Sequence, residues 1–389
     1  MGIMHVFGLS ILIATVVALT SCKEVVVTSK SLRDSNGATV AFNLGGATAN
    51  SVVAFEDNTE IFINGTPLAM LNRGERFSFV AAQMDVLEST KPFFVAGRAG
   101  TNGAAAAFKS NIAWTLPDWA GRNFAFFAAR TPPIHVTVFA FDDSTVELYQ
   151  GGSPQELQNL NEGDTYTFVI TTLGSYELIS TGDIIVHYRA IGGGTNRTDM
   201  RPILPASDDI IGFPSQRVDV SPFNNNNISL YHSNGGTGSN TLTIGTNQAV
   251  TGIANTATSL YQTHALRIES DGLICGQQAA DSNGNASAPF VPTHYVKYRR
   301  IYLNTSADYV AFVSLSPGTI SVYDDQGNGA GTMSLSRTGG GNSPYFARFP
   351  AAGDGFRFES SVPVAAWYHP DTDNDASAQD ETYIYGAEF

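Results

Sequence analysis

Apolar and polar residues alternate with a period of two in many short stretches of this chain. Residues 145–149 (TVELY) and 165–169 (TYTFV) place every second side chain on one face, as half-buried strands do. Residues 184–188 (IIVHY) are apolar almost throughout, which is typical of an inner strand covered on both faces. Turn sequences such as Asn64-Gly65 and Gly151-Gly152 separate the stretches. The pattern predicts an all-β chain of many short strands.

These stretches belong to a unit that repeats along the chain. Its marker is a serine that precedes an apolar strand and recurs with spacings of 91, 90 and 90, at Ser89, Ser180, Ser270 and Ser360. An acidic turn at 54–59 (AFEDNT) returns at 140–145 (AFDDST), and a glycine loop at 72–75 (NRGE) returns at 161–164 (NEGD). In the last copy we expect the acidic turn at 323–325 (YDD). We therefore predict four approximate copies, over 51–135, 136–222, 223–308 and 309–389.

Two architectures fit roughly six to eight short strands per copy. In the first, the copies close into a propeller-like ring to which each copy supplies two four-stranded blades. In the second, they form a row of four immunoglobulin-like β-sandwiches. The copies follow one another without polar linkers, which favours the ring. The segment 22–50 precedes the first copy, and we expect it to hold a strand that closes the last one.

Residues 1–21 have the pattern of an export signal peptide. The apolar run at 8–19 is too short to span a bilayer stably. It leads into residues 19–22 (LTSC), which resemble a bacterial lipobox, so Cys22 is the predicted lipidation site. Residues 1–7 depart from the usual pattern because they contain no Lys or Arg. We expect an exported protein that is lipid-anchored to the outer membrane or cell surface.

Composition excludes some classes of function. The net charge of −14 and the absence of clustered basic residues argue against nucleic-acid binding. Cys22 and Cys275 are the only two cysteines, so a lipidated chain has no internal disulfide. Cys275 lies in an apolar run and is expected to be a small buried residue.

One acidic loop has the spacing of a metal site. Asp371, Asp373 and Asp375 alternate as in the first half of an EF-hand loop, which would make calcium a cofactor. Ala376 replaces the glycine of the sharp turn, and Thr382 stands where a bidentate glutamate belongs. A loose calcium site and a solvated acidic loop both remain open.

Aromatic residues suggest a route to ligand binding. Trp367, Tyr368 and His369 precede the acidic loop, and exposed rings of this kind stack on sugars or anchor protein partners. Trp114 and Trp119 are expected to fill gaps between sheets.

No catalytic motif accompanies these residues, and the histidines are scattered. Asp208, Asp209 and Glu269 could serve a glycosidase. However, a glutamate precedes the marker serine in three copies, which indicates a structural role for Glu269. We predict that the protein is not an enzyme.

The order of landmarks resembles the repeats of the IgGFc-binding protein N-terminal domain family. The resemblance rests on 56–59 (EDNT), 74–80 (GERFSFV), 89–95 (STKPFFV), Leu116-Pro117 and Gly121, and it is strongest over residues 50–220. It implies an extracellular binding or adhesive role and brings no catalytic residues.

The main functional hypothesis is therefore a surface-exposed lipoprotein that acts as a non-catalytic binding or adhesion module for a glycan or surface protein. One alternative is a structural coat or filament subunit that self-assembles. Another is a carbohydrate-active enzyme on a β-propeller.

Overall fold

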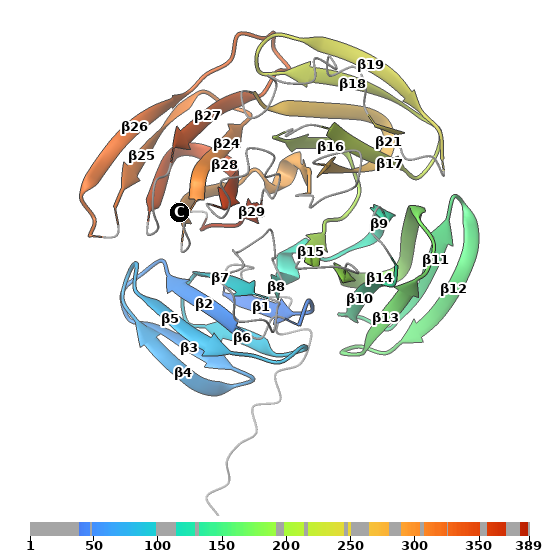
Figure 1. The fold of residues 1–389 in the computed structure, drawn as a ribbon, viewed down its shortest axis with the longest axis horizontal. Coiled ribbons are helices and arrows are strands. Elements are labelled where there is room, and N and C mark those ends of the chain that lie inside the picture. Colours follow the sequence, from blue (N-terminus) through green and yellow to red (C-terminus); the bar gives the residue numbers. More distant parts are fainter. Residues whose placement is uncertain are drawn as a thin grey trace, which may run out of the picture.

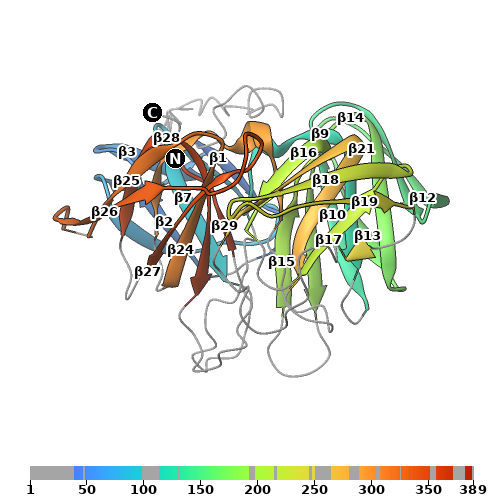
Figure 2. The ribbon, with the colours of Figure 1, turned by 90° about the horizontal axis from the view of Figure 1, so that it is seen from above.

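The computed structural model describes thirteen stretches of the chain, which together contain the strands discussed below. These are residues 39–46, 49–98, 114–128, 132–191, 198–213, 217–244, 248–249, 264–279, 289–303, 307–324, 326–350, 356–370 and 382–387. They form an all-β, propeller-like ring of four units arranged around a common centre (Figure 1). Seen from above in Figure 2, the first and fourth units lie at one end and the second and third at the other. Among the described residues, no helix is long and apolar enough to cross a membrane.

The first unit contains eight strands in a five-stranded and a three-stranded sheet. Their bounds are β1 (Val40–Asn43), β2 (Ala49–Ala54), β3 (Thr59–Ile63), β4 (Thr66–Leu71), β5 (Arg76–Val80), β6 (Val86–Ser89), β7 (Phe93–Arg98) and β8 (Trp114–Thr115). The second unit follows the short 3₁₀ helix η1 (Pro117–Trp119). It comprises β9 (Gly121–Ala128), β10 (Ile134–Ala140), β11 (Ser144–Gln150), β12 (Ser153–Leu160), β13 (Thr165–Ile170), β14 (Gly174–Ile191) and β15 (Thr198–Ile203).

The third and fourth units contain seven strands each. The third comprises β16 (Ser207–Gly212), β17 (Arg217–Pro222), β18 (Asn226–His232), β19 (Thr237–Leu242), β20 (Gln248–Ala249), β21 (Leu266–Ala279) and β22 (Val291–Pro292). After the 3₁₀ helix η2 (Thr293–Tyr295), the fourth comprises β23 (Tyr298–Tyr302), β24 (Ala307–Ser314), β25 (Gly318–Tyr323), β26 (Gly329–Leu335), β27 (Tyr345–Pro350), β28 (Arg357–Pro370) and β29 (Thr382–Ile384).

One long strand links the two sheets of each later unit. The first half of β28 pairs with β25 and β23, and its second half pairs with β24 and β29. Strand β14 is shared in the same way in the second unit. Apolar side chains from both of its sheets, such as Val146 and Val136, meet in one core. Strand β11 shows the alternation that the sequence predicts, with Val146 and Leu148 buried between less buried neighbours.

The marker serine recurs at the same place in every unit, where the chain passes from one sheet to the other; in the first unit this is the end of β6. Its register partners are equivalent apolar residues: Ile61 for Ser89, Val146 for Ser180, Ile228 for Ser270 and Ile320 for Ser360. The residue after each serine accepts a hydrogen bond from a backbone N–H of the neighbouring strand. These bonds run from Glu60 to Thr90 (3.0 Å), Thr145 to Thr181 (2.9 Å), Asn227 to Asp271 (2.8 Å) and Thr319 to Ser361 (2.9 Å). The predicted fourfold repetition is therefore confirmed in the backbone pairing.

The expectation that the N-terminal segment closes the last copy is wrong for the part that the structure describes. Strand β1 pairs with β6 and β8 of its own unit. It occupies the position that β9, β16 and β23 occupy in the other units, beside the first half of the long strand. Each unit therefore begins with its own strand, and the ring closes through side chains.

Neighbouring units pack against each other at seams, and the kind of contact differs from one seam to the next. The rings of Phe42 and Phe139 join the first and second units at 4.7 Å, and the Ala125 N–H donates to Cys275 Sγ (3.3 Å) between the second and third. Phe213 and Phe346 stack at 5.3 Å between the third and fourth, and Phe55 and Tyr302 lie 4.9 Å apart between the fourth and first.

The acidic turn expected at 323–325 lies elsewhere in the fourth unit. Tyr323 ends β25, so Asp324 belongs to the turn between β25 and β26. The turn that corresponds to Asp57 of the first unit is the one between β24 and β25, residues 315–317, which contains no acidic residue. The acidic turn was therefore predicted one turn too late in the chain, because each of these two turns precedes a strand in which apolar and polar residues alternate.

Connections between units fill the centre of the ring. The Tyr295 hydroxyl in η2 donates to the Asp118 carbonyl oxygen in η1 (2.9 Å), and Lys297 forms an ion pair with the Asp118 carboxylate. Trp119 is fully buried and packs edge-on against Tyr385 at 6.0 Å. Trp114 is also fully buried and packs against Phe79 of the other sheet of its unit, at 6.1 Å between ring centres.

Candidate functional site

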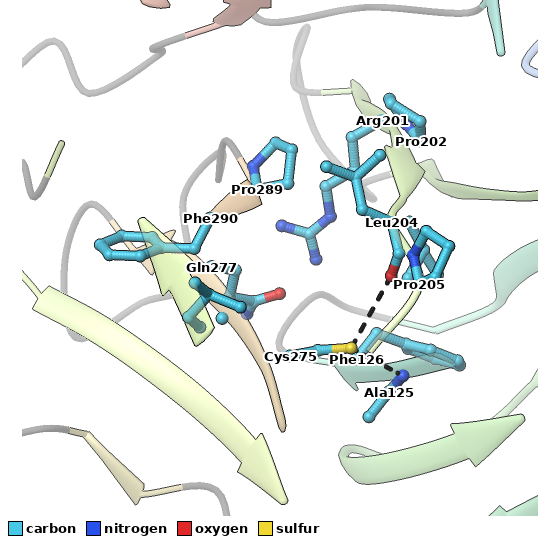
Figure 3. Close-up of a pocket in the computed structure, with 13 residues that line it drawn as sticks. Ala125, Phe126, Arg201, Pro202, Leu204, Pro205, Cys275, Gln277, Pro289 and Phe290 are labelled. Carbon is cyan, nitrogen blue, oxygen red and sulfur yellow. Dashed lines mark hydrogen bonds between the residues drawn. The ribbon is translucent and has the colours of Figure 1, made fainter. Parts of the chain in front are cut away.

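Two seams contain cavities, and their sizes differ. The cavity between the second and third units is shown in Figure 3, where the Arg201 guanidinium and the Gln277 amide point into it. It measures about 20 Å³, which is room for roughly one water molecule. This cavity is too small to hold a ligand.

Cys275 borders this first cavity, but its thiol is not poised for chemistry. Its Sγ accepts a hydrogen bond from the Ala125 N–H (3.3 Å) and donates to the Leu204 carbonyl oxygen (3.7 Å). Burial raises the pKa of the Cys275 thiol to about 12, so the thiol stays protonated and unreactive near neutral pH. Cys275 therefore has a packing role, at the seam rather than within the core of its own unit.

The second cavity lies between the fourth and first units and measures about 160 Å³. From the first unit it is lined by Arg73, in the turn before β5, and by Arg76, at the start of β5. From the fourth unit it is lined by Tyr302 of β23 and Arg357 of β28. Gly74 adopts a φ of +78° in this turn, and a Cβ there would lie 3.7 Å from Cε1 of Tyr302. The left-handed glycine thus brings the arginine-bearing turn against the tyrosine. We name this space the arginine cavity.

The charge in the arginine cavity is positive. Arg76 Nη2 donates to the Leu303 carbonyl oxygen (3.3 Å), and the Arg357 guanidinium lies 4.2 Å from the centre of the Tyr323 ring. Arg73 is exposed and forms no ion pair with any described residue.

Asp324 is the acidic residue among those that line the cavity. It accepts hydrogen bonds from the N–H groups of Gln326 (3.0 Å) and Asn328 (2.7 Å) and from the Asn328 side chain (3.0 Å). These bonds lower the pKa of Asp324. Its carboxylate is thus committed to its own turn. Arg357 lies 3.4 Å from Glu359, whereas the Arg73 side chain forms no ion pair with any described residue.

The Tyr302 hydroxyl is buried in this positive surrounding. The residue is 5% exposed, and the Arg357 guanidinium lies beside its hydroxyl oxygen, whereas its O–H has no acceptor among the described residues. Burial raises the pKa of Tyr302, whereas a hydrogen bond from the Arg357 guanidinium and its positive charge act in the opposite direction. A buried donor without a partner is unfavourable, so this hydroxyl is ready to donate to an acceptor that enters the cavity.

The predicted site residues lie apart from these cavities. The Trp367 side chain is fully buried, and its indole N–H donates to the Pro289 carbonyl oxygen (3.2 Å). Tyr368 is 4% exposed, and His369 belongs to β28. The expectation that these rings stand exposed is therefore wrong for Trp367 and Tyr368, because β28 runs between two partner strands there. The lipidation residue Cys22 and the calcium-site residues Asp371, Asp373 and Asp375 lie outside the described residues.

The carboxylates considered for a glycosidase are engaged in ion pairs. Arg267 Nη2 lies 2.7 Å from Asp209 Oδ2 and 2.9 Å from Glu269 Oε1. The Thr293 hydroxyl also donates to Asp209 (2.9 Å). Asp208 is exposed. Glu359 likewise lies 3.4 Å from Arg357 of its own strand and 3.4 Å from Arg300 of β23, so in the fourth unit this glutamate links two strands.

The structure also pairs two histidines that the sequence shows 32 positions apart. The rings of His232 and His264 lie 5.1 Å apart in the third unit, because the chain returns beside β18 just before β21 begins. Within the described stretches, no group of three or more His, Cys, Asp or Glu side chains could hold a metal ion.

Sequence reasoning missed the arginine cavity, although one signal was present. In the glycine loop, Arg73 and Arg76 stand where the second copy has Glu162 and Thr165. The first copy thus carries basic residues in this turn where the second copy carries an acidic and a neutral one. Departures of this kind mark positions that the scaffold itself does not require.

Comparison with known proteins gives no family for this chain. No family model and no curated protein matches it. Among solved structures it is similar to the Streptomyces avermitilis α-L-rhamnosidase complexed with L-rhamnose. The identity is 9% and the TM-score 0.17, over 86% of this chain and 55% of that chain. A TM-score this low does not indicate a shared fold.

Proposed function

We propose that this protein is an exported lipoprotein, anchored through Cys22 at the outer membrane or cell surface, that acts as a non-catalytic binding or adhesion module. The observation that carries the proposal is the arginine cavity. It is much larger than one water molecule, and guanidinium and phenol groups, which bind ligands well, line it. A ligand would be a glycan or a surface protein.

Two features of the fold support a display scaffold. The recurring polar groups hold strands together, as the four bonds to Thr90, Thr181, Asp271 and Ser361 do. The carboxylates Asp209 and Glu269 share one arginine and are not arranged as an acid and a base around an open cleft. The resemblance to IgGFc-binding repeats also favours binding over catalysis.

Binding is tested by passing the full chain, detergent-solubilised, over arrays of glycans and of extracellular proteins. Saturable retention of a defined ligand without turnover is expected. Hydrolysis of an arrayed glycan would favour the enzymatic alternative over the proposal. If no arrayed glycan or protein retained the chain, the binding proposal would be refuted.

Anchoring is tested separately by fractionating cells that express the chain or its Cys22→Ser variant. The variant should leave the membrane fraction, since a lipid chain attaches to that sulfur. Unchanged membrane retention would contradict the lipoprotein assignment.

A structural coat or filament subunit is the second candidate, and the outer edges favour it. Strands β4, β12, β19 and β26 each pair with one neighbour among the described residues, which leaves the other edge open to another chain. Met70 on β4 is 64% exposed and Leu157 on β12 is 51% exposed. Light scattering that rises with protein concentration, and falls after Leu157→Lys, would support assembly. A monomer at all concentrations would contradict it.

A further inference from the structure

We propose that the arginine cavity binds a single compact oxyanion: a carboxylate, sulfate or phosphate group. The inference rests on the proposed binding function, because it names the ligand chemistry of one cavity in that module. It does not depend on the lipid anchor.

Guanidinium groups are suited to oxyanions by shape as well as charge. Their planar fork of N–H donors can meet two oxygens of one anion, and such charged hydrogen bonds are stronger than neutral ones. Elsewhere in this chain Arg267 meets both oxygens of Asp209 in this way, at 2.9 and 2.7 Å, and Arg122 meets one oxygen of Asp183 at 2.8 Å. Arg73 has no such partner among the described residues. An anion in the cavity would supply the missing partner.

The Tyr302 hydroxyl provides a second, independent reason. It is buried, it borders the cavity, and its O–H has no acceptor in the described part of the chain. An anion oxygen would accept this O–H together with the arginine N–H groups. The donors come from different units, Arg73 and Arg76 from the first and Arg357 and Tyr302 from the fourth. The site therefore exists only when the ring is closed.

Size and overall charge restrict the ligand. A volume of about 160 Å³ accommodates one compact group with a few waters and not an extended chain. The protein as a whole carries a net charge of −14, which repels a polyanion. The ligand is thus a small free anion or one terminal acidic group of a larger molecule.

The test is calorimetric titration of the full chain at constant ionic strength. The probes are sulfate, phosphate and glucuronate, with glucose as the neutral reference. We expect one saturable site for at least one of the anions and none for glucose. Tighter binding of glucuronate would identify a sugar carboxylate as the ligand, and tighter sulfate or phosphate a free inorganic anion; both support the inference. The absence of saturable binding of every anion would overturn it.

Three variants locate the site. Arg73→Gln should weaken anion binding roughly tenfold or more, the usual value of one charged hydrogen bond. The control Arg122→Gln makes the same change in charge on an exposed arginine far from the cavity and should leave affinity unchanged. Tyr302→Phe should weaken binding while leaving the denaturation midpoint of the unliganded chain equal or higher. Equal weakening by Arg73→Gln and Arg122→Gln would reduce the effect to overall charge and refute the site.

The outcomes of the anion titration and of the array experiment can be distinguished. If an arrayed ligand retains the chain but the chain binds none of the anions, the oxyanion site alone is refuted. A chain that binds anions through Arg73 and is retained by no glycan or protein contradicts the adhesion role alone.

Discussion

The paired histidines of the third unit should make the protein lose stability between pH 7 and pH 5. His232 is 6% exposed, and burial together with the neighbouring His264 lowers its pKa from 6.5 to about 4. Burial also lowers the pKa of His264. The unfolded chain therefore binds protons at a higher pH than the folded chain. The stability that neutral histidines contribute is full above pH 6.5, falls as the pH drops, and falls no further below about pH 4.

The magnitude follows from the shift of His232. With folded and unfolded pKa values of about 4 and 6.5, the free energy of unfolding decreases by about 2 kcal/mol between pH 7 and pH 5. His264 adds to this loss in the same direction. A loss of that size is a substantial part of the stability of an ordinary domain.

The assay is urea denaturation followed by tryptophan fluorescence at pH 7, 6 and 5, since the described tryptophans are buried. His232→Gln removes one titrating ring, and its loss of stability over this range should be smaller than that of the wild type by about 2 kcal/mol. His135→Gln, which replaces a partly buried histidine of β10, is the control and should follow the wild type. Equal pH dependence of the wild type and His232→Gln would refute the reasoning, because carboxylate titration is common to both.

Three further predictions concern the repeat, the seam and the centre. Thr181→Val removes the acceptor for the Thr145 N–H and should cost about 1 kcal/mol in urea denaturation, whereas Thr181→Ser should not; equal midpoints would contradict the role of the residue after the marker serine. Cys275 should resist a thiol reagent in the folded chain at mildly alkaline pH and react fully in denaturant, and rapid reaction of the folded chain would show that the seam is open. Tyr295→Phe should lower the unfolding free energy by about 1 kcal/mol through loss of the bond to Asp118, and unchanged stability would mean that the central contact contributes nothing.

The unit could be predicted from the sequence because its determinants are local. Period-two alternation around Val146 and Leu148, the glycine turn at Gly163 and the 90-residue spacing each reflect contacts within one unit, and each is present in the structure. The role of residues 40–43 could not be predicted in the same way. An apolar stretch of that length pairs equally well with any open sheet edge, and the choice between the first and fourth units depends on packing with the second, where Phe42 meets Phe139.

Burial of the aromatic residues depends on the same long-range packing. Trp367 was expected to stand at a surface because it flanks a turn, yet β28 lies between β24 and β29 and its ring is enclosed. Trp119 is enclosed because the connections between units meet at the ring centre. The exposure of a tryptophan near a turn is thus decided by which elements cover that turn, and the local sequence does not contain this information.

The seams explain why binding chemistry and repetition separate in this molecule. Contacts within a unit recur because the four copies share one strand arrangement and therefore pack the same positions against each other. A seam joins the different faces of two diverged copies, so its residues need not match those of the other seams. At the first–second seam the contact is the aromatic pair of Phe42 and Phe139, whereas at the fourth–first seam Arg73 and Arg357 line a cavity beside the buried Tyr302 hydroxyl. Packing at this seam is provided by Phe55 against the ring of Tyr302, and Arg76 adds a hydrogen bond to the Leu303 carbonyl oxygen. The Arg73 side chain, in contrast, forms no ion pair with any described residue, and the oxyanion proposed above would supply its partner in the closed ring.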